Sequence, residues 1–262
     1  MRLIKILFIG DIFGRVGRNI VFSALPNIKK QYGINFVIAN NENATHGHGC
    51  NLNHYKQLSE VGINCFTSGN HFMGCPVPSE DLVPNQIRPL NLPYTYPLSG
   101  SKVFNYNGIK IRVTNLIGNS YIQMGQDNVF TSFENFLKNN NENLIHIVDL
   151  HAEATGEKRA FAEMFDSKVS AIIGTHTHVP TADEKVLPKG TAFITDVGCC
   201  GAVDSVLGAD KKAMIYRSAY GMKTKIENIE HGLAEFNAVV ITIDADTNLA
   251  TNIERINYKE RV

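Results

Sequence analysis

The chain has 262 residues, a formal net charge of zero and a hydrophobic fraction of 44%. This length suits one large domain or two small ones, and the composition is ordinary for a globular protein. Zero net charge provides no general field that would attract nucleic acid or a membrane surface, so the sequence carries no strong nucleic-acid signal. No apolar run approaches the roughly 20 residues of a membrane-spanning helix.

The five cysteines predict reduced thiols and a cytoplasmic location rather than a disulfide framework. Their number is odd and no C-x-x-C pair occurs. Cys199 and Cys200 lie beside glycines in a predicted loop, where a metal or redox role is a minor alternative. The apolar start of the chain runs into Gly10 and Asp11 without a cleavage site, which favours a first strand over a signal peptide.

Apolar runs and helical spacing alternate in the first part of the chain. Strands are predicted at 4–9, 36–39 and 63–67, and helices at 18–32 and 53–61. Pro26 is expected to weaken or kink the first helix. The proline-rich residues 73–97 lack periodicity and are predicted to be a long loop or a small cap near the site.

The second part of the chain adds a hairpin and further alternation. Asn107 and Gly108 form the predicted turn of a hairpin between strands at 103–106 and 109–116. Other strands are expected at 144–150, 169–173, 191–197 and 236–243, and helices at 131–137 and 156–165. This order indicates a single α/β domain over residues 1–262 with mixed sheets.

Polar side chains follow five of the predicted strands. The clusters are Asp11, then Asn41-Glu42-Asn43, Asn70-His71, Asp149 to Glu153 with His151 at the centre, and His176-Thr177-His178. Because ligand sites in open α/β sheets lie beyond the carboxyl ends of strands, these clusters are expected to gather at one rim. Carboxylate, amide and imidazole ligands suit Fe, Mn or Zn, and so many of them favour two metal ions over one.

Each cluster also has a purely structural interpretation. Asp11 could cap a helix, Glu42 and Asn43 could be loop residues, Asn70-His71 could form a turn, and His151 could be a core histidine. Five such coincidences at five strand ends are improbable, so the metal site is the preferred hypothesis.

These clusters together resemble the ordered signature of the calcineurin-like metallophosphoesterases. The matching pieces are Gly10-Asp11, Gly69-Asn70-His71, His151 and Gly174-Thr175-His176-Thr177-His178. Four departures are informative: Phe13 replaces an expected histidine, Asn41-Glu42-Asn43-Ala44 replaces a Gly-Asp pair, and Phe72 follows His71 in place of an acid. The fourth is Thr175, which stands where the Gly-His-x-His motif normally begins its spacing. With these departures, and with residues 10–18, the chain is similar to the YmdB family nearly from end to end.

The resemblance implies a four-layer α-β-β-α sandwich with two mixed sheets and a di-iron site. It also implies phosphodiesterase activity on 2′,3′-cyclic nucleotides, with 3′-nucleotides as products, and suggests a homo-oligomer. By position, Asp11, Asn43 and His178 would hold the first metal, and Asn70, His151 and His176 the second. Glu42 would bridge the two ions, a hydroxide on the metals would be the nucleophile, and His71 would be the general acid.

Several residues near these motifs keep two interpretations. Arg15 and Arg18 could meet the substrate phosphate near a helix N-terminus, or could be solvated. His46 and His48 could touch the substrate or belong to a surface loop. Either Asp149 or Glu153 could orient His151, and the role of Asp196 is left open.

Other functions fit the same motifs. A phosphomonoesterase or phosphoprotein phosphatase would use the same bimetal core, so the ligands do not separate it from a phosphodiesterase. A metal-containing regulatory protein that affects RNA or signalling is a hypothesis from another class.

Overall fold

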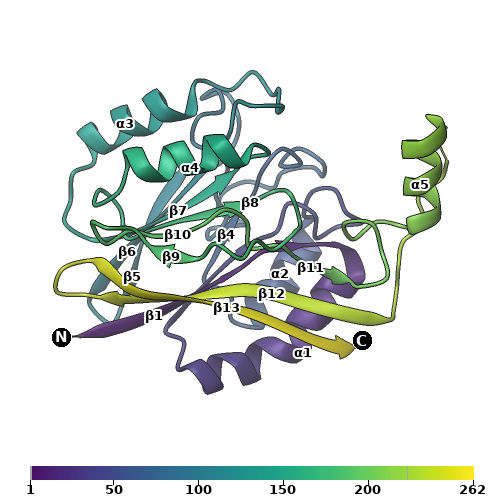
Figure 1. Ribbon diagram of the computed structural model, residues 1–262, viewed down its shortest axis with the longest axis horizontal. Helices are drawn as coiled ribbons and strands as arrows, with labels where there is room; N and C mark the ends of the chain where they lie inside the picture. The colour runs from purple at the N-terminus through teal and green to yellow at the C-terminus, as the bar shows by residue number, and fades with distance from the viewer. Residues whose placement is uncertain (1, 223) are drawn as a thin grey trace.

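The computed structural model describes residues 2–222 and 224–262, which form two facing β-sheets with helices on both outer sides (Figure 1). The strands of the first sheet are β1 (Leu3–Ile9), β2 (Asp11–Ile12), β3 (Phe36–Asn40), β4 (Cys65–Thr67), β11 (Cys199–Ala202), β12 (Leu233–Asp244) and β13 (Leu249–Arg261). Their order is β2-β11-β12-β1-β3-β4, and β13 pairs with β12. The sheet is mixed because β1, β3 and β4 run parallel while β12 runs antiparallel to β1.

The second sheet is also mixed. Its strands are β5 (Ser101–Tyr106), β6 (Ile109–Ile117), β7 (Ile145–His151), β8 (Ala171–Thr175), β9 (Lys185–Val186) and β10 (Ala192–Ile194), in the order β5-β6-β7-β8-β10-β9. The four strands β6, β7, β8 and β10 are parallel, and β5 and β9 close the edges in the antiparallel sense. The predicted hairpin is confirmed, and Asn107 and Gly108 both have positive φ, as a tight hairpin turn requires.

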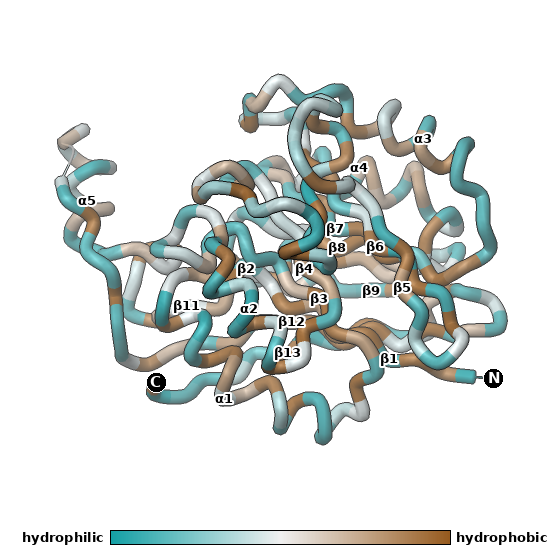
Figure 2. Tube along the Cα trace, turned by 180° about the vertical axis from the view of Figure 1, so that it is seen from behind, coloured by the Kyte–Doolittle hydropathy of each residue, from teal (hydrophilic) through white to brown (hydrophobic). Residues whose placement is uncertain are grey.

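Four helices complete the layers. Helices α1 (Gly14–Tyr32) and α2 (Leu52–Glu60) pack on the first sheet, and α3 (Val129–Asn139) and α4 (Thr155–Met164) cover the second (Figure 1). A fifth helix, α5 (Lys211–Tyr220), projects away from the body of the molecule in both Figure 1 and Figure 2. The mixed α/β architecture with two mixed sheets is the one predicted from the sequence.

The buried side chains of β1 show how one strand serves two cores. Ile6 and Phe8 belong to the cluster between the two sheets, whereas Leu7 and Ile9 belong to the cluster beneath α1 and α2. Because successive side chains of a strand point to opposite faces, a continuous apolar run is needed where both faces are covered. The uninterrupted run at the start of the chain therefore reflects the burial of the first sheet on both sides.

Some element boundaries differ from the prediction. α1 begins at Gly14 and continues through Pro26, which is tolerated at an exposed position. α3 begins after Asn128, whose side chain accepts hydrogen bonds from the backbone N–H groups of Phe130 and Thr131. The loop predicted around Cys199 and Cys200 is wrong: both lie in β11 as buried free thiols.

Residues 73–97 contain turns and a single β-bridge, with no helix or longer strand. Arg88 organises this segment from within, because its buried side chain donates hydrogen bonds to the carbonyl oxygens of Pro89, Leu92 and Leu98. The role of the segment as a cap near the site stays a prediction. Within the described ranges, every helix is too short or too polar to cross a bilayer.

Candidate metal centre

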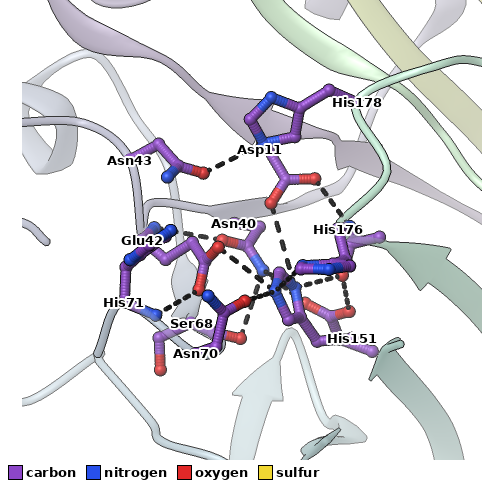
Figure 3. Close-up of polar contacts among 12 residues, drawn as sticks. Asp11, Asn40, Glu42, Asn43, Ser68, Asn70, His71, His151, His176 and His178 are labelled. Carbon is purple, nitrogen blue, oxygen red and sulfur yellow. Dashed lines mark hydrogen bonds and ion pairs between the residues drawn. The ribbon is translucent and has the colours of Figure 1, made fainter. Parts of the chain in front are cut away.

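The site lies where the carboxyl ends of parallel strands from both sheets meet. Ile9 of β1 pairs beside Ala39 of β3, and His151 of β7 pairs beside Thr175 of β8, so the residues that follow these strands emerge at one rim. Figure 3 shows the resulting group. The structure brings together eight sequence-predicted side chains: Asp11, Glu42, Asn43, Asn70, His71, His151, His176 and His178.

His151 is at the centre of this group. Its Nε2 atom lies 3.1 Å from Glu42 Oε1, 3.0 Å from Asn70 Oδ1 and 3.1 Å from His176 Nδ1. A single ring nitrogen can donate one proton or offer one lone pair, so it cannot satisfy three such neighbours by hydrogen bonding. Glu42, His151 and His176 can together hold a metal ion, since their ligand atoms lie within 4.8 Å of one another.

A second set of donors adjoins the first. His178 Nε2 lies 3.2 Å from Asn43 Oδ1, and Asp11 Oδ2 accepts a hydrogen bond of 3.2 Å from the backbone N–H of His176. Asp11 is fully buried, yet its Oδ1 atom has no hydrogen-bond partner among the described residues. A buried carboxylate oxygen without a partner is costly, by about 1–3 kcal/mol. A bound cation would remove that cost, so the donors fit a metal at this place too.

The pKa values reflect the same concentration of ligands. Burial alone would raise the pKa of Glu42 and lower that of His151, but their mutual attraction outweighs burial and shifts both in the opposite direction. Burial and the neighbouring positive charge of His151 lower the pKa of His176 to about 3. Burial raises the pKa of Asp11. The low pKa of His176 keeps its imidazole neutral near neutral pH, and the neutral form is the one that can ligate a metal.

The far side of the His151 ring is held by a buried relay. Its Nδ1 atom lies 2.9 Å from Thr175 Oγ1, and the Thr175 hydroxyl donates a hydrogen bond of 2.7 Å to Asp149 Oδ1. The other oxygen of Asp149 accepts a bond of 3.1 Å from the Asn40 amide. Because the hydroxyl gives its proton to Asp149, it accepts the Nδ1 proton of His151, which leaves Nε2 free to face the centre.

His176 has its own carboxylate partner. Glu153 Oε2 lies 3.0 Å from His176 Nε2, so the opposite ring nitrogen, Nδ1, faces His151. The prediction that Asp149 or Glu153 orients His151 is therefore resolved in an unexpected way. Asp149 acts on His151 through Thr175, whereas Glu153 contacts the other histidine.

A cleft of about 320 Å³ opens over the centre. Its lining includes Glu42, His71 and His178, and also a segment that the sequence did not suggest, with Val206, Leu207, Ala209 and Met214. His178 Nδ1 donates a hydrogen bond of 2.8 Å to the Leu207 carbonyl oxygen, which ties this segment to the site. This apolar segment follows β11 and contains no recognisable binding motif, so the sequence alone does not mark it as part of the cleft.

His71 lies beside the centre without joining the close contacts of His151. Its backbone N–H donates to Glu42 Oε2 at 3.0 Å, and its ring packs edge-on against His48, with 4.3 Å between ring centroids. Burial lowers the pKa of His71, and the charge of Glu42 opposes that shift. The side chain lines the cleft, where it can reach a bound ligand.

The two predicted phosphate-binding arginines lie outside this cleft. Arg15 forms an exposed ion pair of 2.9 Å with Glu230, and the buried Arg18 donates a hydrogen bond to the Ala44 carbonyl oxygen. Both line an adjoining cavity that also includes His46. Contact between these arginines and the substrate phosphate stays a prediction.

A model of the family described as YmdB-like protein matches residues 7–256. The chain belongs to the YmdB-like family. It is 44% identical to a Mycoplasma genitalium protein with a provisional phosphatase/phosphodiesterase name, over 97% of this chain and 92% of that protein. It is 39% identical, over 96% of both chains, to the 2′,3′-cyclic-nucleotide 2′-phosphodiesterase of Bacillus subtilis.

A solved structure extends the likeness to three dimensions. The crystal structure of a novel phosphatase from Mycoplasma pneumoniae superimposes with a TM-score of 0.92 at 38% identity and covers 100% of this chain and 95% of that one. The predicted family and the metallophosphoesterase-like fold are confirmed, and this member of the YmdB-like family is a hydrolase.

Proposed function

We propose that the chain is a phosphodiesterase that hydrolyses 2′,3′-cyclic nucleotides to 3′-nucleotides at a pair of metal ions. The observation that carries this proposal is the convergence of carboxylate, amide and imidazole donors beneath one cleft. The activity printed for the Bacillus subtilis relative supports the choice of substrate. The family supports an ester of phosphate as the general substrate class.

The ligands divide into two sets around one shared carboxylate. Asp11, Asn43 and His178 would hold the first ion, and Asn70, His151 and His176 the second. Glu42 would be shared by the two sets; in the structure its Oε1 lies 3.1 Å from His151 Nε2, a donor of the second set. The mixture of hard oxygen and borderline nitrogen donors favours iron, with manganese or zinc as alternatives. Such a pair of ions, when bound, supplies charge neutralisation for the phosphate and activation of a water molecule.

His71 is the proposed general acid. Water adds to the phosphorus, the bond from phosphorus to the ribose O2′ breaks, and the protonated imidazole of His71 delivers a proton to O2′. The attacking water gives up one proton, which restores the protonated form of His71. Its position fits this task because it follows Asn70 directly and lines the cleft without contacting Nε2 of His151. General acid catalysis of this kind contributes about 10²–10⁴-fold to the rate.

Replacement of His71 by asparagine tests the proposal with two substrates. Hydrolysis of 2′,3′-cyclic AMP should fall by about 10²–10⁴-fold, because the ribose oxygen leaves poorly without a proton. Hydrolysis of bis-p-nitrophenyl phosphate should fall far less, because p-nitrophenolate leaves unaided. His231→Asn, at an exposed position outside the cleft, is the control and should behave as wild type. Equal losses on both substrates, with metal content unchanged, would rule out the acid role.

A phosphomonoesterase is the second candidate, and the Mycoplasma pneumoniae structure named as a phosphatase favours it. The two functions share one metal core, so the substrate rather than the ligands separates them. Faster hydrolysis of p-nitrophenyl phosphate than of bis-p-nitrophenyl phosphate would favour the monoesterase. The reverse order would favour the diesterase.

We also propose that residues 1–262 form one domain, because β12 and β13 from the end of the chain complete the sheet begun by β1. The cytoplasmic location and the homo-oligomer stay predictions.

A further inference from the structure

The segment that carries His176 and His178 has an unusual backbone. Both residues have positive φ, 99° and 66° respectively, directly after the end of β8. Residues other than glycine adopt such conformations at a cost of about 1–3 kcal/mol each, so the surrounding structure must hold them in place. The contacts of the intervening Thr177 and of Thr175 show how this is done.

Asp196 holds the middle of the segment. It follows β10, is fully buried, and accepts a hydrogen bond of 3.0 Å at Oδ2 from the backbone N–H of Thr177. Its other oxygen, Oδ1, accepts a bond of 2.8 Å from the backbone N–H of Gly198. Because Thr177 lies between the two histidines, this single contact limits the movement of both.

Lys158 of α4 completes the arrangement from the opposite side. Its fully buried Nζ donates a hydrogen bond of 2.8 Å to Asp196 Oδ2 and one of 2.7 Å to the carbonyl oxygen of Thr175. The ion pair thus bonds the segment at a carbonyl before His176 and at an N–H after it. Burying two charges is expensive and is tolerated only when they pair with good geometry, as they do here.

We propose that the Lys158–Asp196 ion pair positions His176 and His178 and thereby sets the metal affinity of both halves of the centre. Lys158 and Asp196 are positioning residues, since neither lines the cleft. The inference rests on the proposed function, because it takes His176 and His178 as ligands. A pair that served stability alone would affect unfolding without changing metal affinity in the folded protein.

The experiment measures Mn²⁺ binding to metal-free protein by titration calorimetry, together with urea unfolding. Asp196→Asn keeps the shape but places an NH₂ group where one carboxylate oxygen accepted a bond. The double variant Lys158→Met/Asp196→Asn makes the same change without stranding the lysine charge. Asp166→Asn is the matched control: Asp166 is buried and accepts bonds from the backbone N–H groups of Lys189 and Thr191, away from the metal centre.

Asp196→Asn should weaken Mn²⁺ binding by about 10–100-fold, the usual effect of removing a partner that orients metal ligands. The double variant should also bind more weakly than wild type, and it supplies the answer if the single variant fails to fold. Asp166→Asn should lower stability and leave Mn²⁺ affinity unchanged. Wild-type affinity in a folded Asp196 variant would overturn the positioning role while the proposed function stands. Absence of Mn²⁺ binding by the wild-type protein would instead overturn the proposed metal centre itself.

Discussion

Replacing Thr175 with valine removes one hydroxyl from the centre of the relay behind His151. Valine has nearly the same shape, so packing at this fully buried position is preserved. The change breaks the 2.9 Å contact with His151 Nδ1 and the 2.7 Å bond to Asp149 Oδ1. The other oxygen of Asp149, Oδ2, keeps the hydrogen bond that it accepts from the Asn40 amide.

The expected loss follows from the groups left without partners. One buried imidazole N–H and one buried carboxylate oxygen lose their hydrogen bonds, at about 1–3 kcal/mol each, so the free energy of unfolding should fall by about 2–6 kcal/mol. His151 also loses the partner that selects its tautomer. Metal affinity should therefore fall by about 10–100-fold, the range found when a partner of a metal-bound histidine is removed.

The assay compares Thr175→Val with Thr175→Ser, which keeps the hydroxyl and removes the methyl group. Urea unfolding of the metal-free proteins gives the stability loss, and calorimetric titration with Mn²⁺ gives the affinity. The serine variant should stay close to wild type in metal affinity. If valine and serine weaken Mn²⁺ binding equally, the relay through the hydroxyl does not orient His151.

Two further changes test the close packing of the site and its electrostatics. A methyl group at Gly69 would press on His151 Nε2 and Glu42 Oε2, so Gly69→Ala should lower stability by about 1–3 kcal/mol and deplete metal in the purified protein. Gly156→Ala in α4, where a methyl group meets open space, is the control and should keep its metal. Burial lowers the pKa of His146 to about 3, against about 6.5 in an unfolded chain. Between these values the unfolded chain binds the extra proton, so stability should fall as pH drops below about 6.5, by up to about 1.4 kcal/mol per pH unit. Urea unfolding at several pH values should show that the free energy of unfolding depends less on pH in His146→Gln than in the wild type. The same pH dependence in both proteins would contradict a lowered pKa for His146.

The polar residues of the site could be predicted because each group follows a short apolar run. Such runs indicate buried strands, and parallel strands place their carboxyl ends together. Asp11, Glu42 and His151 were accessible to this reasoning, since each comes within three residues after the end of its predicted strand. The sequence therefore predicted where the donors gather, although their metal-binding roles stay a prediction.

β13 was missed because its buried residues do not alternate. Ala250, Ile253 and Ile256 are three residues apart, a spacing that suggests a helix more than a strand. The register between β12 and β13 shifts between Thr242 and Ile243, which brings Ala250 and Ile253 to the same core. Ile256 then faces the core beneath α1. A bulge of this kind hides the period of two that identifies a strand.

The residues that hold the proposed ligands in place could not be predicted from the sequence, for a different reason. Lys158 and Asp196 are 38 residues apart and meet only because α4 packs against the second sheet. The same holds for Leu207, whose carbonyl oxygen lies 29 residues from the His178 ring that it contacts. Pairings of this kind depend on tertiary packing, and one sequence carries no local signal for them.

The proposed carboxylate and imidazole ligands come from different sheets. Both proposed carboxylate ligands, Asp11 and Glu42, come after β1 and β3 of the first sheet, and the three proposed histidine ligands lie at or after the ends of β7 and β8 of the second. Neither sheet alone offers a complete set of donors, so the centre exists only when the core between the sheets is formed. A metal ion bound across this junction would interact with both sheets and favour the packed state over the unfolded one. The apolar core between the sheets includes Phe8. Its packing sets the distance between the carboxylates of one sheet and the imidazoles of the other, and so determines whether they can bind the same metal ions.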